Sequence, residues 1–228
     1  MHRFLSLTCL GLMTVGFVGT GAIAQTSPDP EPIPPRTVPT ETEVDPIERV
    51  VAARLMTRDA NGDFHAERAL TRAQLATILV KTFDLGKRIP ERPNATLPND
   101  VPTSHWASDA IQIVLKTNTM RGDTETQFKP NRTMTRAEGF AIFAQAYGVF
   151  QYEPETVQSI LNQYPDASSL PVWTRQAMAT ALNEGFVNLG TNKRIRPGET
   201  MTRGDIAYAL SDYLSRRQPP AYVPDPTR

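Results

Sequence analysis

One short motif occurs three times in this chain, and this repetition constrains the fold more than any other feature. The motif is a threonine, an arginine, a small residue and an acidic or amide residue, at 71–74, 135–138 and 202–205. Its threonines are 64 and 67 residues apart, and an apolar residue precedes each threonine by seven positions. A unit this small cannot bury its apolar face alone, so we expect the three copies to pack together.

Each copy has the pattern of a helix, a loop and a second helix. In copy 2, apolar residues at helical spacing predict a helix from Trp106 to Leu115. A loop from Asn118 to Thr133 follows, and a second helix starts at Thr135. The expected fold class is therefore all-α. The other predicted helices are 72–83 and 203–214, the second helices of copies 1 and 3, and an additional one at 153–162.

The two ends of the chain differ from the repeats. The first 24 residues contain a short polar start, an apolar stretch and an Ala-x-Ala sequence, which predict a secretory signal cleaved before Gln25. A retained membrane anchor is the alternative, but the stretch is short for a membrane span. Proline-rich composition predicts extended segments on both sides of the repeats. The expected divisions are a signal peptide (1–24), a spacer (25–44), three repeats (45–97, 98–163 and 164–217) and a tail (218–228).

Composition excludes several classes of function. The 24 basic residues are balanced by 24 acidic ones, whereas a nucleic-acid-binding domain normally shows a basic excess. A single cysteine excludes a disulfide framework and a cysteine-based metal site. No nucleophile, zinc or nucleotide motif is present, so neither an enzyme nor a cofactor is expected. A wall-degrading enzyme remains a minor alternative, because carboxylates alone cannot exclude a glycosidase.

Residues 59–63 begin like a calcium-binding loop. Position six of that pattern is Phe64 rather than glycine, and position twelve is Leu70 rather than glutamate. We therefore expect a turn here and no metal site.

Copy 2 contains a series of short motifs in a specific order, at residues 100–102, 105–107, 110–111, 122–123, 128–131 and 135–138. The order and spacing of these motifs resemble those of the S-layer homology domain. Copy 3 resembles the family more loosely, and copy 1 does so only in its second half, which suggests a truncated start. The resemblance implies a pseudo-threefold assembly, with one helix of each copy in a central bundle and grooves between neighbouring copies. It also implies attachment of an exported protein to peptidoglycan-linked polysaccharide, often through an acidic, pyruvate-modified sugar.

The arginines of the motif are the first candidate binding residues. Thr135 and Glu138 form a predicted capping box, which accounts for the threonine and the acid but not for the arginine between them. A cation in the first helical turn opposes the helix dipole. We predict that Arg72, Arg136 and Arg203 bind sugar carboxylates; the alternative is that each pairs with a nearby acid. On the first interpretation, Arg136→Ala weakens wall binding without destabilising its helix.

Aromatic and loop residues complete the candidate polysaccharide site. Trp106 and Trp173 begin the first helices of copies 2 and 3, where each could stack on a sugar ring; core packing is the alternative. The family resemblance adds Gly122 and Asp123. Copy 1 has Thr42 at the tryptophan position, so we expect at most two competent grooves.

The expected function is non-catalytic binding to the cell wall by a protein of the periplasm or cell envelope. Its expected partner is peptidoglycan-linked polysaccharide. In the alternative, the repeats of a periplasmic adaptor bind an envelope protein. Neither a nucleic-acid partner nor a membrane span after signal cleavage is expected.

Overall fold

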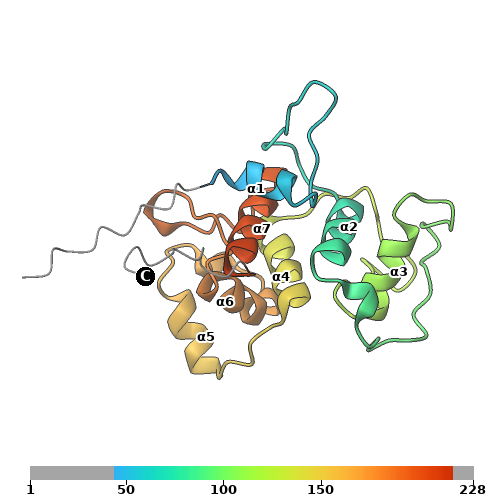
Figure 1. The fold of residues 1–228 in the computed structure, drawn as a ribbon. Helices are drawn as coiled ribbons and strands as arrows, with labels where there is room; N and C mark the ends of the chain where they lie inside the picture. The colour runs from blue at the N-terminus through green and yellow to red at the C-terminus, as the bar shows by residue number, and fades with distance from the viewer. Residues whose placement is uncertain (1–43, 218–228) are drawn as a thin grey trace, which may run out of the picture. The chain divides into compact units, whose positions relative to one another are not determined.

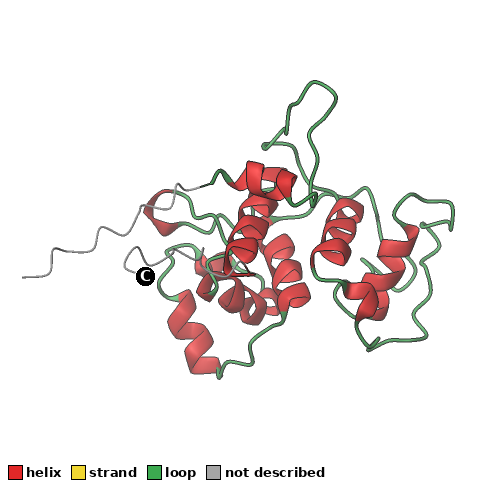
Figure 2. Cartoon of the chain, viewed as in Figure 1, coloured by secondary structure: helices red, strands yellow, loops and turns green. Residues whose placement is uncertain are grey.

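The computed structural model describes residues 44–217, all within one compact unit, Thr42–Arg228. The predicted signal peptide, the spacer up to its last residue and the tail lie outside the described residues. The described part consists of helices and loops without a β-strand, which confirms the all-α class (Figure 2). The α-helices are α1 (Pro46–Ala52), α2 (Arg72–Thr82), α3 (Ser108–Lys116), α4 (Arg136–Tyr147), α5 (Pro154–Leu161), α6 (Arg175–Asn183) and α7 (Arg203–Arg217). The short 3-10 helices are η1 (Leu85–Lys87), η2 (Ala167–Ser169), η3 (Val172–Thr174) and η4 (Thr191–Lys193).

The helix predictions agree with the structure, with small differences at the ends. Helices α2, α4 and α7 each begin directly after the threonine of the motif, and α5 confirms the additional helix. Helix α3 starts two residues later than predicted, because Trp106 and Ala107 lie in a turn closed by the Ser108 amide, which donates to the His105 carbonyl at 2.9 Å. Copy 1 does have its own first helix, α1, which has seven residues against nine in α3.

Capping boxes fix where the second helices begin. The Thr135 hydroxyl accepts the Glu138 amide at 3.2 Å, and the Glu138 carboxylate accepts the Thr135 amide at 2.9 Å. Thr71 and Gln74 make the same two bonds in copy 1. In copy 3 an aspartate replaces the longer residue and still closes the box. The capping box predicted for Thr135 and Glu138 is therefore confirmed, and copies 1 and 3 contain equivalent boxes.

The Thr135 cap contributes measurably to the stability of the fold. Replacing Thr135 with alanine removes the acceptor for one first-turn amide, and should lower the free energy of unfolding by about 0.5–2 kcal/mol. Urea titration followed by circular dichroism measures the change. Thr135→Ser keeps the oxygen and should stay close to the wild type, so an equal loss in both variants would contradict the capping explanation.

The packed helix pairs do not coincide with the sequence repeats. Helix α3 of copy 2 packs on α2 of copy 1, and α6 of copy 3 packs on α4 of copy 2. Helix α1, at the start of the described chain, packs on α7 at its end (Figure 1). Each second helix thus pairs with the first helix of the next copy, and the last pair closes the three copies into a ring.

Backbone hydrogen bonds connect the copies in the same cyclic order. The amides of Arg72 and Ala73, in the first turn of α2, donate to the carbonyls of Arg132 and Pro130 in copy 2, both at 3.0 Å. These bonds satisfy amides that a helix start leaves without an intrahelical partner. The equivalent donors and acceptors are Arg136 and Ala137 with Glu199 and Pro197, and Arg203 and Gly204 with Arg68 and Ala66. This threefold repetition of contacts supports the expected pseudo-threefold assembly.

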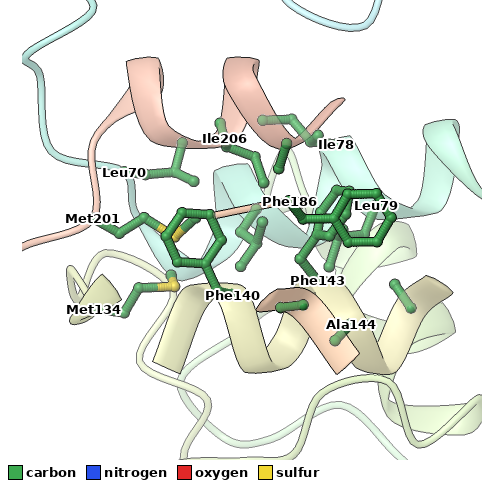
Figure 3. Close-up of a cluster of buried hydrophobic side chains, with 14 of the residues drawn as sticks. Leu70, Ile78, Leu79, Met134, Phe140, Phe143, Ala144, Phe186, Met201 and Ile206 are labelled. Atoms are coloured by element: carbon green, nitrogen blue, oxygen red, sulfur yellow. The ribbon is translucent and has the colours of Figure 1, made fainter. Parts of the chain in front are cut away.

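The second helices of all three copies contribute to a common apolar core. Leu79 of α2, Phe140 and Phe143 of α4 and Ile206 of α7 are fully buried and lie close together (Figure 3). A Cβ at position 139 would lie 1.7 Å from the Met201 sulfur, so a larger residue than glycine there would displace this buried side chain. The close contact between Met201 of copy 3 and α4 therefore depends on the lack of a side chain at Gly139.

Candidate functional site

Each motif arginine reaches from its helix start to the loop of the next copy. In Arg72, Nε donates to the Phe128 carbonyl at 2.8 Å, and Nη2 donates to the Arg121 carbonyl at 2.6 Å. The guanidinium also lies over the Phe128 ring, 4.5 Å from its centre. These two carbonyls, rather than the end of its own helix, explain why an arginine occupies this position.

Arg203 repeats this arrangement, whereas Arg136 adds an acidic partner. Arg203 donates to the carbonyls of Phe64, at 3.0 Å, and Thr57, at 2.8 Å. No ion pair joins Arg72 or Arg203 to a carboxylate within the described residues. Arg136, in contrast, forms an ion pair with Asp205.

The surroundings of Arg136 favour a structural role. Its side chain is 1% exposed, and it donates to the Ile195 carbonyl at 2.9 Å and to both oxygens of Asn188, at 2.9 and 2.8 Å. Asp205 is 6% exposed. The alternative interpretation, pairing with a nearby acid, is thus what the structure shows for Arg136. The expectation that Arg136→Ala leaves the helix stable needs correction, because the substitution leaves a buried carboxylate without its cation.

A pocket of about 440 Å³ lies where the three copies meet. It combines Arg72 from copy 1, the 118–123 loop and α4 from copy 2, and Trp173 and Ala177 from copy 3. We call it the Arg72 pocket. Four of the seven predicted site residues line it, namely Arg72, Gly122, Asp123 and Trp173. Arg136, Arg203 and Trp106 are not among its lining residues.

Ion pairs organise the charged wall of the Arg72 pocket. Asp123 lies 2.6 Å from the Lys129 ammonium and 3.2 Å from Arg132 Nε, and Arg132 also pairs with Glu138 at 3.3 Å. The hydrogen bond from Lys129 is the main cause that lowers the pKa of Asp123, so this carboxylate stays ionised in mildly acidic solution. Arg132 Nε is buried and makes no hydrogen bond within the described residues. Its ion pair with Asp123 is therefore an electrostatic contact without hydrogen-bond geometry.

The charge balance of the Arg72 pocket is slightly positive. Three arginines, Arg72, Arg121 and Arg132, line it together with two acids, Asp123 and Glu138. Burial is the main cause that lowers the pKa of Arg72, and the neighbouring Arg132 adds to it. Since arginine stays protonated at any physiological pH, an anionic group placed in this pocket would relieve the repulsion between these cations.

Gly122 shapes the loop that forms one side of the pocket. A Cβ at this position would lie 2.2 Å from the Thr124 carbonyl oxygen and 3.0 Å from that of Gln127. The Asp123 amide donates to the same Gln127 carbonyl at 2.8 Å. A larger residue at 122 would therefore displace backbone, and with it the position of Asp123.

Both tryptophans are surface residues. Trp106 and Trp173 are each 64% exposed, so the alternative of core packing is wrong for both. Trp173 lines the Arg72 pocket, whereas Trp106 stacks on His105 with the ring centres 5.6 Å apart. An exposed indole next to a cationic pocket presents a flat apolar face to a ligand.

Sequence reasoning missed part of the pocket. Its additional lining residues include Asn118, Arg121, Arg132 and Gln145. A signal for Arg132 was present, since Arg68 occupies the same position in copy 1, three residues before the motif threonine. The other residues come together only through folding.

The surroundings of the other two motif arginines differ from those of Arg72. Next to Arg136, the position of Gly122 is taken by Leu189, and that of Glu138 by the paired Asp205. Around Arg136, the residue equivalent to Trp173 is Thr42, which lies outside the described residues. Next to Arg203, the equivalents of Gly122, Glu138 and Trp173 are Arg58, Gln74 and Trp106. Arg203 thus keeps a tryptophan and lacks an acid at the position of Glu138.

The loop that resembles a calcium site is a turn, as predicted. Asp59 accepts the amides of Asn61 and Asp63 at 2.8 and 2.9 Å, and its carbonyl accepts the Gly62 amide at 3.1 Å. A hydrogen bond with His65 is the main cause that lowers the pKa of Asp59. Within residues 44–217, histidine, cysteine and acidic side chains form no group of three that could hold a metal. None of the helices in this range is both long and apolar enough to cross a bilayer.

Comparison with known proteins agrees with the resemblance seen in the sequence. The family model described as the S-layer homology domain matches residues 99–138 and 163–207, in copies 2 and 3. The structure shows that copy 1 contributes equivalent helices, although the family model does not match it.

Three relatives illustrate the range of proteins in which similar segments occur. The surface-layer 125 kDa protein of Lysinibacillus sphaericus is 29% identical over 72% of this chain and 13% of its own length. An amylopullulanase of Thermoanaerobacterium thermosulfurigenes is 24% identical over 75% of this chain and 9% of its own length. A cellulosome-anchoring protein of Acetivibrio thermocellus is 25% identical over 68% of this chain and 34% of its own length. The chain thus spans a minor part of each of these relatives.

Proposed function

We propose that this protein is an exported, non-catalytic component of the cell envelope that binds peptidoglycan-linked polysaccharide. The observation that carries the proposal is the Arg72 pocket, in which three copies place cations, a loop and an exposed indole around one cavity. The matching family model and relatives named as surface-layer and anchoring proteins support the same role. The similarity to an amylopullulanase covers only 9% of that enzyme, so it gives no support for catalysis.

Binding in the pocket combines charge and stacking. A sugar carboxylate fits between Arg72 and Arg132, whose guanidinium groups offer planar donors. The apolar face of the sugar ring stacks on Trp173. Gly122 and Asp123 hold the loop in place, and the pairing of Asp123 with Lys129 keeps that wall fixed. Such binding is an equilibrium process that needs no cofactor.

A second, weaker site follows from the threefold repetition. Arg203 and Trp106 occupy the positions of Arg72 and Trp173, and Arg203 has no carboxylate partner within the described residues. Arg136 has its cation neutralised by Asp205, so we assign no ligand to it. Two sites on one rigid body would strengthen attachment to a polymer through high effective concentration.

Co-sedimentation with purified sacculi tests the proposal. The protein should pellet with untreated sacculi and stay in the supernatant after acid treatment has stripped the attached polysaccharide. Binding to neither preparation would contradict the proposal and favour the alternative, a periplasmic adaptor that uses the repeats to contact an envelope protein. A fall in the turbidity of the sacculi would instead indicate a wall-degrading enzyme.

The contribution of Trp173 can be measured separately. Trp173→Ala should weaken binding to untreated sacculi about tenfold, which corresponds to roughly 1.4 kcal/mol. Because this side chain is mostly exposed, the free energy of unfolding should hardly change. Val172→Ala is the matched control, since Val172 is 82% exposed next to Trp173 and does not line the pocket. Equal binding by both variants would exclude stacking at Trp173.

A further inference from the structure

A second pocket adjoins the Arg72 pocket on the other side of its loop. This pocket of about 400 Å³ lies between the segment that connects α2 to α3 and the loop after α3. We call it the Arg92 pocket. Arg121 and Gly122 line both pockets, so the two cavities share a boundary only two residues wide.

The backbone holds Arg92 in place even though its side chain is on the surface. The Arg92 amide donates to the Lys116 carbonyl at the end of α3, at 2.8 Å. The Arg92 carbonyl accepts the Ala95 amide at 3.0 Å, and the Ala95 carbonyl accepts the Gln112 side chain at 2.5 Å. These bonds attach the connecting segment to α3 and keep Arg92 beside the cavity.

Side-chain bonds join the walls of the two pockets. Arg121 Nε donates to the Asn118 side-chain oxygen at 3.2 Å, and Asn118 lines the Arg72 pocket. The Asn118 side-chain nitrogen donates to Glu91, in the connecting segment, at 3.0 Å. These bonds hold the two pockets in a fixed position relative to one another, so a ligand that extends over Gly122 would contact both of them.

The charges of the Arg92 pocket resemble those of its neighbour. Two arginines, Arg92 and Arg121, line it together with one acid, Glu125. Neither arginine forms an ion pair within the residues that the structure describes. The cavity therefore has one more cation than acid in its lining, and the polar residues Asn94, Thr96 and Thr124 offer hydrogen bonds.

We propose that the two pockets form one continuous groove for an internal stretch of acidic polysaccharide. A first anionic sugar lies beside Arg72 and Arg132, and a second anionic group on the same chain lies between Arg92 and Arg121. This inference rests on the proposed function and adds that at least two charged sugars of the polymer are recognised together. The protein would then distinguish polysaccharides by their length and by the spacing of their charged sugars.

The test uses the acidic polysaccharide that mild acid releases from sacculi, separated by length into short and long fragments. The full-length wild-type chain should bind long fragments about three- to fivefold more tightly than short ones. This increase in affinity is what one additional exposed ion pair contributes. Arg92→Gln should remove this preference for length and leave the binding of short fragments unchanged. Lys87→Gln is the matched control, because it removes one positive charge from the same segment outside both pockets, at an 81% exposed side chain.

The outcomes separate this inference from the proposed function. Equal affinity of wild type for short and long fragments, or an Arg92→Gln variant that keeps the preference, would overturn the continuous groove alone. If Lys87→Gln also lost the preference for long fragments, the preference would depend on the net charge of the segment rather than on Arg92, and the continuous groove would be overturned. If the wild type binds no fragment, the proposed function fails together with the inference.

Discussion

Arg136→Ala is expected to lower the free energy of unfolding by about 3–5 kcal/mol. The substitution leaves Asp205, which is 6% exposed, without the guanidinium that neutralises it. It also removes the donors that bind the Ile195 carbonyl and Asn188 and thereby join copy 2 to copy 3. Urea denaturation of the purified variant gives the change directly.

Arg72→Ala is the matched control for this prediction. Arg72 occupies the same position in copy 1 and donates to two carbonyls, but it has no carboxylate to leave unpaired within the described residues. It should therefore be less destabilising than Arg136→Ala and should weaken wall binding more. Addition of Asp205→Asn to Arg136→Ala should recover part of the lost stability, because the uncompensated charge is removed. Similar stability of Arg136→Ala and wild type would contradict a structural role for this arginine.

The three motif arginines have different partners, which the sequence alone could not predict. The motif predicted the helices and the capping boxes, because these depend on local patterns, and its repetition in units too small to fold alone predicted that the three copies pack together. It could not predict which arginine meets an acid. Asp205 and Glu138 occupy the same motif position, yet Asp205 pairs with Arg136, whereas Glu138 pairs with Arg132. That choice depends on distances between copies.

A fragment of residues 99–217 is expected to lose the cooperative fold entirely. This fragment contains both segments that the family model matches, but it lacks α1 and α2. Without them, α7 and α3 lose their packing partners, and Arg203 loses the carbonyls of Thr57 and Phe64. Loss of near-ultraviolet circular dichroism and of a sigmoidal urea transition would show this result.

A circular permutant provides the control for chain connectivity. Joining residue 217 to residue 44 by a flexible linker and opening the chain between Ile89 and Pro90 keeps all seven helices. Ile89 is 91% exposed, so the new ends disturb little packing. The permutant should unfold cooperatively, as the wild type does. A fragment 99–217 that folds as well as the permutant would contradict the closed ring.

The closed ring also explains why the pocket could be predicted only in part. Trp173, Gly122 and Asp123 stand out as sequence features, and all three line the Arg72 pocket. Each sequence copy contributes its first helix to one pair and its second helix to another, so no single copy contains a complete site. Arg72 of copy 1 and Trp173 of copy 3 join the copy 2 residues of the pocket through this offset, which has no local sequence signal.

Fluorescence of Trp173 tests the central claim most directly. The chain contains two tryptophans, so Trp106→Phe leaves Trp173 as the sole indole reporter. Titration with acid-released wall polysaccharide should change its emission saturably, and Arg72→Gln should shift the titration to higher concentrations. Unchanged Trp173 emission at polysaccharide concentrations that saturate binding would show that the polymer binds elsewhere and that the Arg72 pocket is not the site.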